Sequence, residues 1–534
     1  MECRSCVNKV SESRIIRQRK KVETMNGPYL AMRPMTHMIK ASIFVALTAV
    51  LLTIPRISIA QSPAQSPPTA PAPAANTQAP PTEREKALQE EIQKLEGRIE
   101  SLEKQNPAAG TTVAGANLPQ SATLTGSPQA AAEAERSSYG VLDASGQGFL
   151  VAKTPRAALW IGGYALVRYI DQMPANQTFT DHLGNVNTID SRNDIQFHRA
   201  MVNFRGYLGS QKLRYQITAW AVMSTNQTTL YGFIGYQFHK KFNVYGGTSS
   251  IGGTRSLTGS HPFWLGNDRV MADEYFKSGF TNTVWVNGEI LPGLWYQATV
   301  GNNLSQLGLT AKQLTRDLAT GAQAWWMPTT REFGPSGAYG DWEYHEKVGT
   351  RFGFTSARSR EDRFNQNNNP SPDNTTVRLA DSTLLFQTGT VAPDVTVQKS
   401  DVHSLSADAG VKYRGVFLQA EFFRRALNDF QADGPLPVSE IVDRGFYVQG
   451  AFFPIKKKLE LYGATSWIYG DKNAGFKNSH EYLGGTNYYP FASRNYRLNA
   501  QIINVDHSPV SSLFGYYVGG QKGWTVAAAF SVLF

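Results

Sequence analysis

The last twelve residues, 523–534, constrain the fold of this chain most, because their side chains alternate strictly between two kinds. Successive side chains of a strand point to opposite faces. One face here is wholly apolar with an aromatic residue at each end, and it consists of Trp524, Val526, Ala528, Phe530, Val532 and Phe534. The other face is small and mixed, and it consists of Gly523, Thr525, Ala527, Ala529, Ser531 and Leu533. A soluble sheet can produce this pattern, but a strand between lipid and a pore requires it.

The same alternation begins near residue 157 and recurs to the end of the chain. It is clearest in residues 200–208, 213–221, 405–413, 416–422 and 496–502. Each segment approaches the ~9–11 residues that a tilted strand needs to cross a bilayer. Short polar turns join some neighbours, and long polar segments separate others, at residues 173–193, 304–322, 359–402, 428–442 and 470–480.

This pattern predicts an all-β fold, an antiparallel transmembrane β-barrel of about 16 strands over residues 157–534. Residues 255–345 are hard to divide into strands and loops, and this region could change the number of strands by two. The last strand is expected to close the barrel against the first, near residues 158–170.

The N-terminal 60 residues have the pattern of a secretory signal. Lys40 precedes an apolar run at 41–54, and Ser58-Ile59-Ala60 forms a small-x-Ala cleavage site. Residues 1–37 are either an extension of this signal or untranslated. A transmembrane helix needs ~20 apolar residues, and Pro55 ends the run before that length.

The net charge of +10 at first suggests a nucleic-acid partner, but most of it lies in the signal region. Residues 1–60 hold ten basic and three acidic residues, which leaves 42 basic and 39 acidic residues in the remainder. We therefore expect no nucleic-acid partner. Cys3 and Cys6, the only cysteines, lie in the same segment, so neither a zinc site nor a disulfide framework is expected in the mature chain.

A short coiled coil is predicted between two linkers. Residues 61–82 form a Pro/Ala-rich linker, and residues 106–156 a flexible one. Between them, in 83–105, a heptad seam is formed by Leu88, Ile92, Leu95, Ile99 and Leu102. The alternatives are a helix packed on a neighbour, or a dimeric or trimeric coiled coil. A periplasmic coiled coil could contact the cell wall or another partner.

Cations on the polar faces of the strands indicate a path for anions. Those expected to face the lumen are Arg168, Arg199, Arg205, Arg214, Arg351, Lys412, Arg414, Arg425 and Arg497. Rings of Arg or Lys select anions in pores. The alternative is that these cations pair with interior carboxylates, of which Asp408, Glu421 and Glu460 are the candidates, and simply fill the wall.

No catalytic or cofactor site is predicted. His345 stands between carboxylates in the run Glu343-Tyr344-His345-Glu346, but a second histidine at metal spacing is missing, and a solvated loop is the favoured interpretation. Asn428-Asp429 and Asp433-Gly434 lack the spacing of a calcium loop. We therefore expect no enzyme, no metal and no cofactor.

The C-terminal third resembles the phosphate-selective porin family. The resemblance lies in GFYVQGAFF at 445–453, KLELYG at 458–463 and EYLGGTNYYP at 481–490, and also in the strand from Arg199 to Leu208 with Tyr215. It covers roughly residues 155–534, is diffuse through 255–400 and is strongest after 445. The family's constriction residues have no clear counterparts here, because the loops that carry them do not align.

The resemblance implies a homotrimer of sixteen-stranded barrels in the lipid of a Gram-negative outer membrane, with inward loops that narrow an arginine-lined channel. Related porins for dicarboxylates also carry an N-terminal coiled coil. The expected function is a passive channel for small anions, phosphate or carboxylates. The alternative is a structural anchor whose periplasmic coiled coil tethers the envelope.

Overall fold

The computed structural model describes Gln93 and residues 142–143, 148–223, 226–258, 261–364, 366, 376–512 and 515–534. The chain divides into two units, residues 1–120 and 121–534. The first contains only one described residue, Gln93, which is helical and falls in the predicted coiled coil. The predicted signal peptide, the Pro/Ala-rich linker and the rest of the coiled coil lie outside the described residues. In the part of the chain that is described, no helix is long and apolar enough to cross a membrane.

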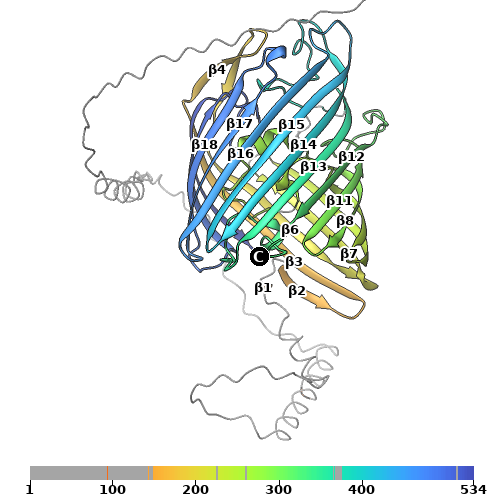
Figure 1. Cartoon of the computed structure of the whole chain (residues 1–534), viewed down its shortest axis with the longest axis vertical. Helices are drawn as coiled ribbons and strands as arrows, with labels where there is room; N and C mark the ends of the chain where they lie inside the picture. Colours follow the sequence, from red (N-terminus) through yellow and green to blue (C-terminus); the bar gives the residue numbers. More distant parts are fainter. Residues whose placement is uncertain are drawn as a thin grey trace, which may run out of the picture. The chain divides into compact units, whose positions relative to one another are not determined.

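Sixteen antiparallel strands among the described residues form a closed barrel, as the sequence predicts (Figure 1). Each strand pairs with the next, and β20 closes the barrel on β3, from Trp524 opposite Met173 to Leu533 opposite Tyr164. The strands are β3 (Ala157–Met173), β6 (Asn193–Leu208), β7 (Ser210–Val222), β8 (Gln227–His239), β9 (Phe242–Ser250), β10 (Phe280–Leu291), β11 (Leu294–Gly301), β12 (Ala319–Trp326), β13 (Gly349–Asp362), β14 (Val397–Tyr413), β15 (Val416–Ala432), β16 (Glu440–Ile455), β17 (Leu459–Tyr469), β18 (Asn478–Tyr488), β19 (Tyr496–Asp506) and β20 (Gly523–Leu533).

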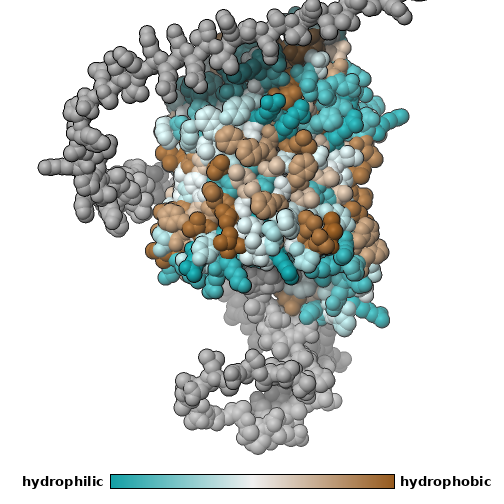
Figure 2. All heavy atoms as spheres, in the orientation of Figure 1, coloured by the Kyte–Doolittle hydropathy of each residue, from teal (hydrophilic) through white to brown (hydrophobic). Residues whose placement is uncertain are grey.

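The two faces of the wall follow the alternation of the sequence. In β20, Trp524 is 51% exposed on the outer face, whereas Thr525, its neighbour, is fully buried on the lumen face. Hydrophobic residues are spread over the middle of the visible outer surface, and hydrophilic residues gather toward its two ends (Figure 2). The predicted assignment of faces in the last strand is therefore confirmed.

The connections differ between the two ends of the barrel. At the long-loop end they comprise residues 174–192, 223–226, 251–279, 302–318, 363–396, 433–439, 470–477 and 507–522. The first of these contains the hairpin of β4 (Asn176–Thr180) and β5 (Val186–Asp190), which lies at the top of Figure 1. At the short-turn end most connections have one to seven residues, and the exception is residues 327–348.

Part of the predicted flexible linker 106–156 is ordered sheet, which corrects that prediction. β1 (Leu142–Asp143) pairs with β2 (Gly148–Lys153), and β2 pairs with β3 at Ala158–Ile161. This is the stretch of β3 that lies beyond its pairing with β20. The hairpin thus gives partners to backbone groups that would otherwise form an open sheet edge.

Two connections between strands fold into the barrel. This explains why residues 255–345 are hard to divide into strands and loops from the sequence. The β9–β10 loop, residues 251–279, contains the short helices η2 (Arg255–Leu257) and α4 (Met271–Phe276). The β12–β13 loop, residues 327–348, contains η3 (Pro335–Gly337), and η4 (Lys472–Ala474) lies in a long-end connection. Leu265, Met271 and Phe333 are buried in these loops. Loops that pack inside a lumen need apolar side chains, so the usual contrast between polar loop and apolar strand disappears.

Candidate functional site

The β9–β10 loop crosses the lumen and attaches to the wall at widely separated strands. The Arg255 backbone N–H donates to Glu421 Oε1 of β15 at 2.8 Å. Asn267 Nδ2 donates to Asn499 Oδ1 of β19 at 2.7 Å. The Met271 backbone N–H donates to Glu481 Oε2 of β18 at 2.8 Å. The loop is thus fixed to the wall by buried hydrogen bonds.

Asp268 anchors the same loop to β3 and β6, on the other side of the closing strand β20 from β19. Its carboxylate lies 3.2 Å from Arg168 Nη1 of β3 and 2.9 Å from Arg199 Nη2 of β6. Burial alone would raise the pKa of Asp268, but the charge of Arg199, the His198 hydrogen bond and the charge of Arg168 hold that pKa well below its usual range. The carboxylate is therefore ionised and compensates two buried guanidinium groups.

The β12–β13 loop enters from the short-turn end and meets the β9–β10 loop. The Tyr339 backbone N–H donates to Phe263 O at 2.9 Å, and Arg255 Nη2 donates to Gly337 O at 2.6 Å. Arg494, from the β18–β19 turn, holds this loop by donating to Tyr339 O at 2.8 Å and to Glu343 Oε1 at 3.2 Å. The two loops therefore form one constriction across the lumen.

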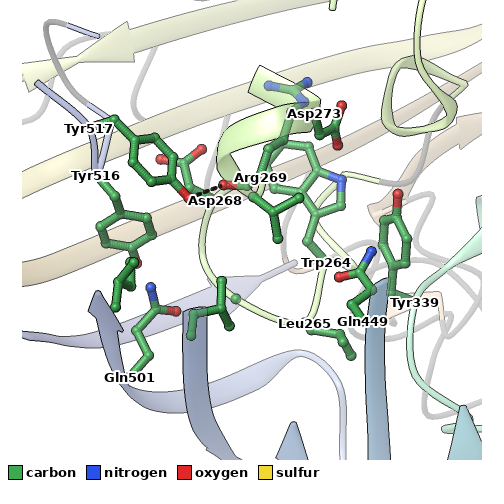
Figure 3. Close-up of a pocket in the computed structure, with 14 residues that line it drawn as sticks. Trp264, Leu265, Asp268, Arg269, Asp273, Tyr339, Gln449, Gln501, Tyr516 and Tyr517 are labelled. Atoms are coloured by element: carbon green, nitrogen blue, oxygen red, sulfur yellow. Dashed lines mark hydrogen bonds between the residues drawn. The ribbon is translucent and has the colours of Figure 1, made fainter. Parts of the chain in front are cut away.

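The constriction leaves little space on the side of β16 to β19. A pocket there, shown in Figure 3, has a cavity volume of about 20 Å³, which is enough for one water. Trp264, Tyr339, Tyr516 and Tyr517 surround it, and Gln501 and Gln449 point toward it from the strands below. Burial raises the pKa of Tyr339 to about 12, so its phenol is neutral. This pocket is therefore too small for a solute larger than water.

Five of the nine predicted lumen cations are buried and paired with interior carboxylates. Arg168 and Arg199 share Asp268, as described. The other pairs are Arg351 Nε with Asp408 Oδ1 at 2.9 Å, Arg425 Nη2 with Asp443 Oδ2 at 2.8 Å, and Lys412 Nζ with Glu343 Oε2 at 3.7 Å. For these five the alternative interpretation, that they fill the wall as ion pairs, describes the geometry better.

Three further predicted cations face the lumen, but their contacts differ from those of the five paired cations. Arg497 donates to two neutral oxygens, Trp264 O at 2.8 Å and Asn267 Oδ1 at 2.9 Å. Arg205 and Arg214 are only half-buried. Their strands pair directly, with Tyr207 opposite Arg214 and Arg205 opposite Gln216, so the two guanidinium groups are diagonal neighbours on one face.

Arg414 does not face the lumen, which corrects its prediction. It lies with Gly415 in the two-residue turn between β14 and β15, has a φ of 47° and is exposed. The alternation of the strand ends at Tyr413, the last residue of β14, which pairs with Val416. Extrapolating the two-residue period by one residue therefore placed Arg414 on the wrong surface.

The predicted carboxylates Asp408, Glu421 and Glu460 are all buried on the lumen face, but their distribution escaped the sequence analysis. Every strand from β13 to β19 contains an acidic residue, whereas β7, β8, β9, β11 and β12 contain none. The signal was present in the sequence: residues 195–267 include no Asp or Glu. In β10, Glu289 lies near the short-turn end, where Lys240 Nζ is 2.5 Å from its Oε2.

Water reaches the lumen face of β8 and β9, two of the strands that contain no acidic residue. On the lumen face of β14 to β20 most side chains are buried under the inward loops, among them Gln419, Tyr447 and Thr525. On the lumen face of β8 and β9, by contrast, Phe233, Gln237 and Tyr245 are half-buried. The loops therefore pack against the acidic wall and leave the lumen accessible along β8 and β9, whereas Thr299 of β11 and Gln323 of β12 are buried.

His345 is buried, so the interpretation of its segment as a solvated loop is wrong. One ring nitrogen, Nδ1, bonds Asp341 Oδ1, and the other, Nε2, lies 2.6 Å from Glu332 Oε1. Asp341 Oδ2 also accepts the Gly415 backbone N–H at 2.6 Å. Possible metal-ligand atoms of Asp341, Glu343 and His345 lie within 4.8 Å of one another. The hydrogen bonds of this group tie the β12–β13 loop to the β14–β15 turn.

No protein-family model and no curated relative matches the chain. Solved structures are similar to the chain at low identity. The anion-selective porin from Comamonas acidovorans is 12% identical, with 71% of this chain and 100% of that chain covered and a TM-score of 0.44. The outer membrane channel DcaP of Acinetobacter baumannii is 11% identical, with 72% and 99% covered and a TM-score of 0.40. OmpF of Salmonella typhi, in complex with daunomycin, is 12% identical, with 72% and 100% covered and a TM-score of 0.43. Similarity at this level concerns the barrel architecture and not what each protein carries.

Proposed function

We propose that the chain is a passive diffusion channel of a Gram-negative outer membrane and prefers small anions. The supporting observation is the lumen wall from β7 to β12, which water reaches along β8 and β9. This wall carries Arg214 on β7, with Arg205 adjacent on β6, and a single carboxylate, Glu289, already beside Lys240. A lumen with fixed cations and few fixed anions attracts anions, and several weak sites in series allow both entry and exit.

The apolar outer face of the barrel supports placement in lipid (Figure 2). Closure of the barrel supports it too, because the backbone N–H and C=O groups of every strand then find hydrogen-bond partners without water. The short-turn end would face the periplasm. We also propose a homotrimer, the N-terminal signal peptide, and a periplasmic coiled coil over residues 83–105. Phosphate and carboxylates are the anions to test first.

The experiment is the reversal potential of planar bilayers that contain the purified full chain, measured under a potassium chloride gradient. The expected result is a potential of the sign that chloride selectivity gives. Arg205→Gln with Arg214→Gln should reduce this selectivity, and Arg414→Gln, in the exposed turn, should leave it unchanged. A potential of the opposite sign, showing cation preference, would overturn the proposal.

A further inference from the structure

A cross-strand row of side chains on the lumen face of β7 to β10 combines a cation with aromatic rings, of which Tyr245 is half-buried and Trp285 is buried. Arg214 of β7 lies opposite Gly235 of β8, Gly235 lies opposite Tyr245 of β9, and Tyr245 lies opposite Trp285 of β10. The Tyr245 and Trp285 rings are nearly parallel, with an interplanar angle of 14° and centroids 5.4 Å apart. The row therefore places one guanidinium group two strands away from a pair of stacked rings.

Gly235 makes this arrangement possible. A Cβ atom at Gly235 would lie 1.9 Å from Cδ1 of Tyr245, so the Tyr245 ring covers the position that any other side chain would occupy. The ring thus lies over the strand between Tyr245 and Arg214, on the side of the cation. Phe233 completes the aromatic surface, since its ring centroid is 5.7 Å from that of Trp285.

Hydrogen bonds link the cation to the rings. Arg214 Nε donates to Gln237 Oε1 at 3.3 Å, and Gln237 Nε2 donates to the Tyr245 hydroxyl at 3.2 Å. On the other side, the Arg214 guanidinium lies over the Tyr207 ring, 5.5 Å from its centroid. Arg205, diagonally adjacent, has a buried Nε without a hydrogen-bond partner among the described residues. The half-buried guanidinium of Arg214 therefore lies beside the aromatic surface, where it can donate to an anion.

Rings of this kind continue toward the short-turn end. Trp295 of β11 lies opposite Trp325 of β12, and their rings are 6.4 Å apart with an interplanar angle of 6°. Both are half-buried on the lumen face. Aromatic residues that contact lipid lie on the outer face, as Trp326 does. Trp295 and Trp325 face the lumen instead, so contact with lipid does not explain them.

We propose that this wall, centred on Arg214, Tyr245 and Trp285, binds small aromatic carboxylates as they pass through the channel. This inference rests on the proposed function and names its solute class. A carboxylate accepts hydrogen bonds from guanidinium groups, while a flat ring gains from contact with Tyr and Trp rings. Because the strands of this wall lack acidic residues apart from Glu289, little repels the carboxylate. An aliphatic anion of equal charge gains only the first interaction.

The test measures block of chloride current through the full chain in planar bilayers, with benzoate and with cyclohexanecarboxylate as probes. The two probes have the same charge and similar size, and only benzoate has an aromatic face. Contact between aromatic rings predicts that benzoate blocks at a concentration about three- to tenfold lower. Tyr245→Leu and, separately, Trp325→Leu should reduce this difference, whereas Trp326→Leu, the adjacent residue on the outer face, should keep it.

A second set of variants tests the cation. Arg214→Gln should weaken block by benzoate, Arg214→Lys should restore part of it, and Arg414→Gln should have no effect. Folding of each variant is checked by heat-modifiable migration in electrophoresis, so that a misfolded barrel is not read as a lost site.

The possible outcomes separate this inference from the proposed function. Equal block by the two probes in a channel that still prefers anions overturns the aromatic site alone. Block by glucose at the same concentration as benzoate also overturns it, because the rings would then serve a neutral sugar. Cation preference in the reversal potential overturns the proposed function itself.

Discussion

Trp325 and Trp326 are consecutive residues of β12, yet they lie on opposite sides of the barrel wall. Trp325 faces the lumen, where its ring is parallel to that of Trp295, and Trp326 is 49% exposed on the outer face. The two-residue period of a strand produces this separation. It also gives a matched pair of positions at which the same substitution affects either the channel or the outer surface.

Replacing Asp268 with Asn should loosen the β9–β10 loop. The change leaves Arg168 and Arg199 buried without their shared carboxylate, and breaking a buried ion pair costs roughly 3–5 kcal/mol. The loop should then leave its position part of the time, which single-channel recordings would detect as larger current fluctuations. Asp317→Asn, in an exposed loop, is the control. Recordings as quiet as those of the unmodified chain would show that Asp268 does not hold the loop.

The anchoring of this loop should be insensitive to mild acid. The folded-state pKa of Asp268 is held below its usual value, so the stability it contributes is present above the unfolded value of about 3.9 and is lost only as pH falls through the lower, folded value. Current fluctuations should therefore not change between pH 7 and pH 5. An increase over this interval would contradict the assignment of the anchor to Asp268.

The barrel itself could be predicted from the sequence, because the two-residue alternation reports directly which side of a strand is apolar. The closure of residues 523–533 on β3 followed from it. The placement of cations was predictable only in part. The period puts Arg168 and Arg351 on the lumen face, and Asp408 was a candidate partner, but the period does not reveal that Asp268, from a distant loop, neutralises Arg168.

The inward loops escaped prediction for a related reason. Leu265 and Phe333 are apolar because they are buried against the lumen wall, and a sequence pattern does not distinguish this burial from that of a strand. The absence of acidic residues from 195–267, in contrast, was readable. Noticing it would have pointed to the wall formed by β7, β8 and β9, which a search for individual arginines overlooks.

Replacing Arg494 with Gln should free the β12–β13 loop and widen the short-turn end. The change removes the bonds to Tyr339 O and Glu343 Oε1, and hydrogen bonds to a charged group contribute about 1.5–3 kcal/mol. A tenfold or greater increase in the open population follows from that energy, and it should appear as a higher mean single-channel conductance. Lys457→Gln, in an exposed turn at the same end, should leave the conductance unchanged.

The last strand offers a test of the outer face. Ala528 is exposed there, between the lumen-facing Ala527 and Ala529. If this face contacts lipid as proposed, Ala528→Arg should destabilise the folded barrel by about 2–4 kcal/mol, the cost of an arginine near the bilayer midplane. Denaturant titration of barrels folded into lipid vesicles measures this change. The same substitution at Ala311, in an exposed loop at the long-loop end, should cost little, because an arginine there remains in water. Equal stability of the two variants would mean that the apolar face of β20 does not lie in lipid. The apolar residues that alternate along the last strand would then have to contact something other than lipid.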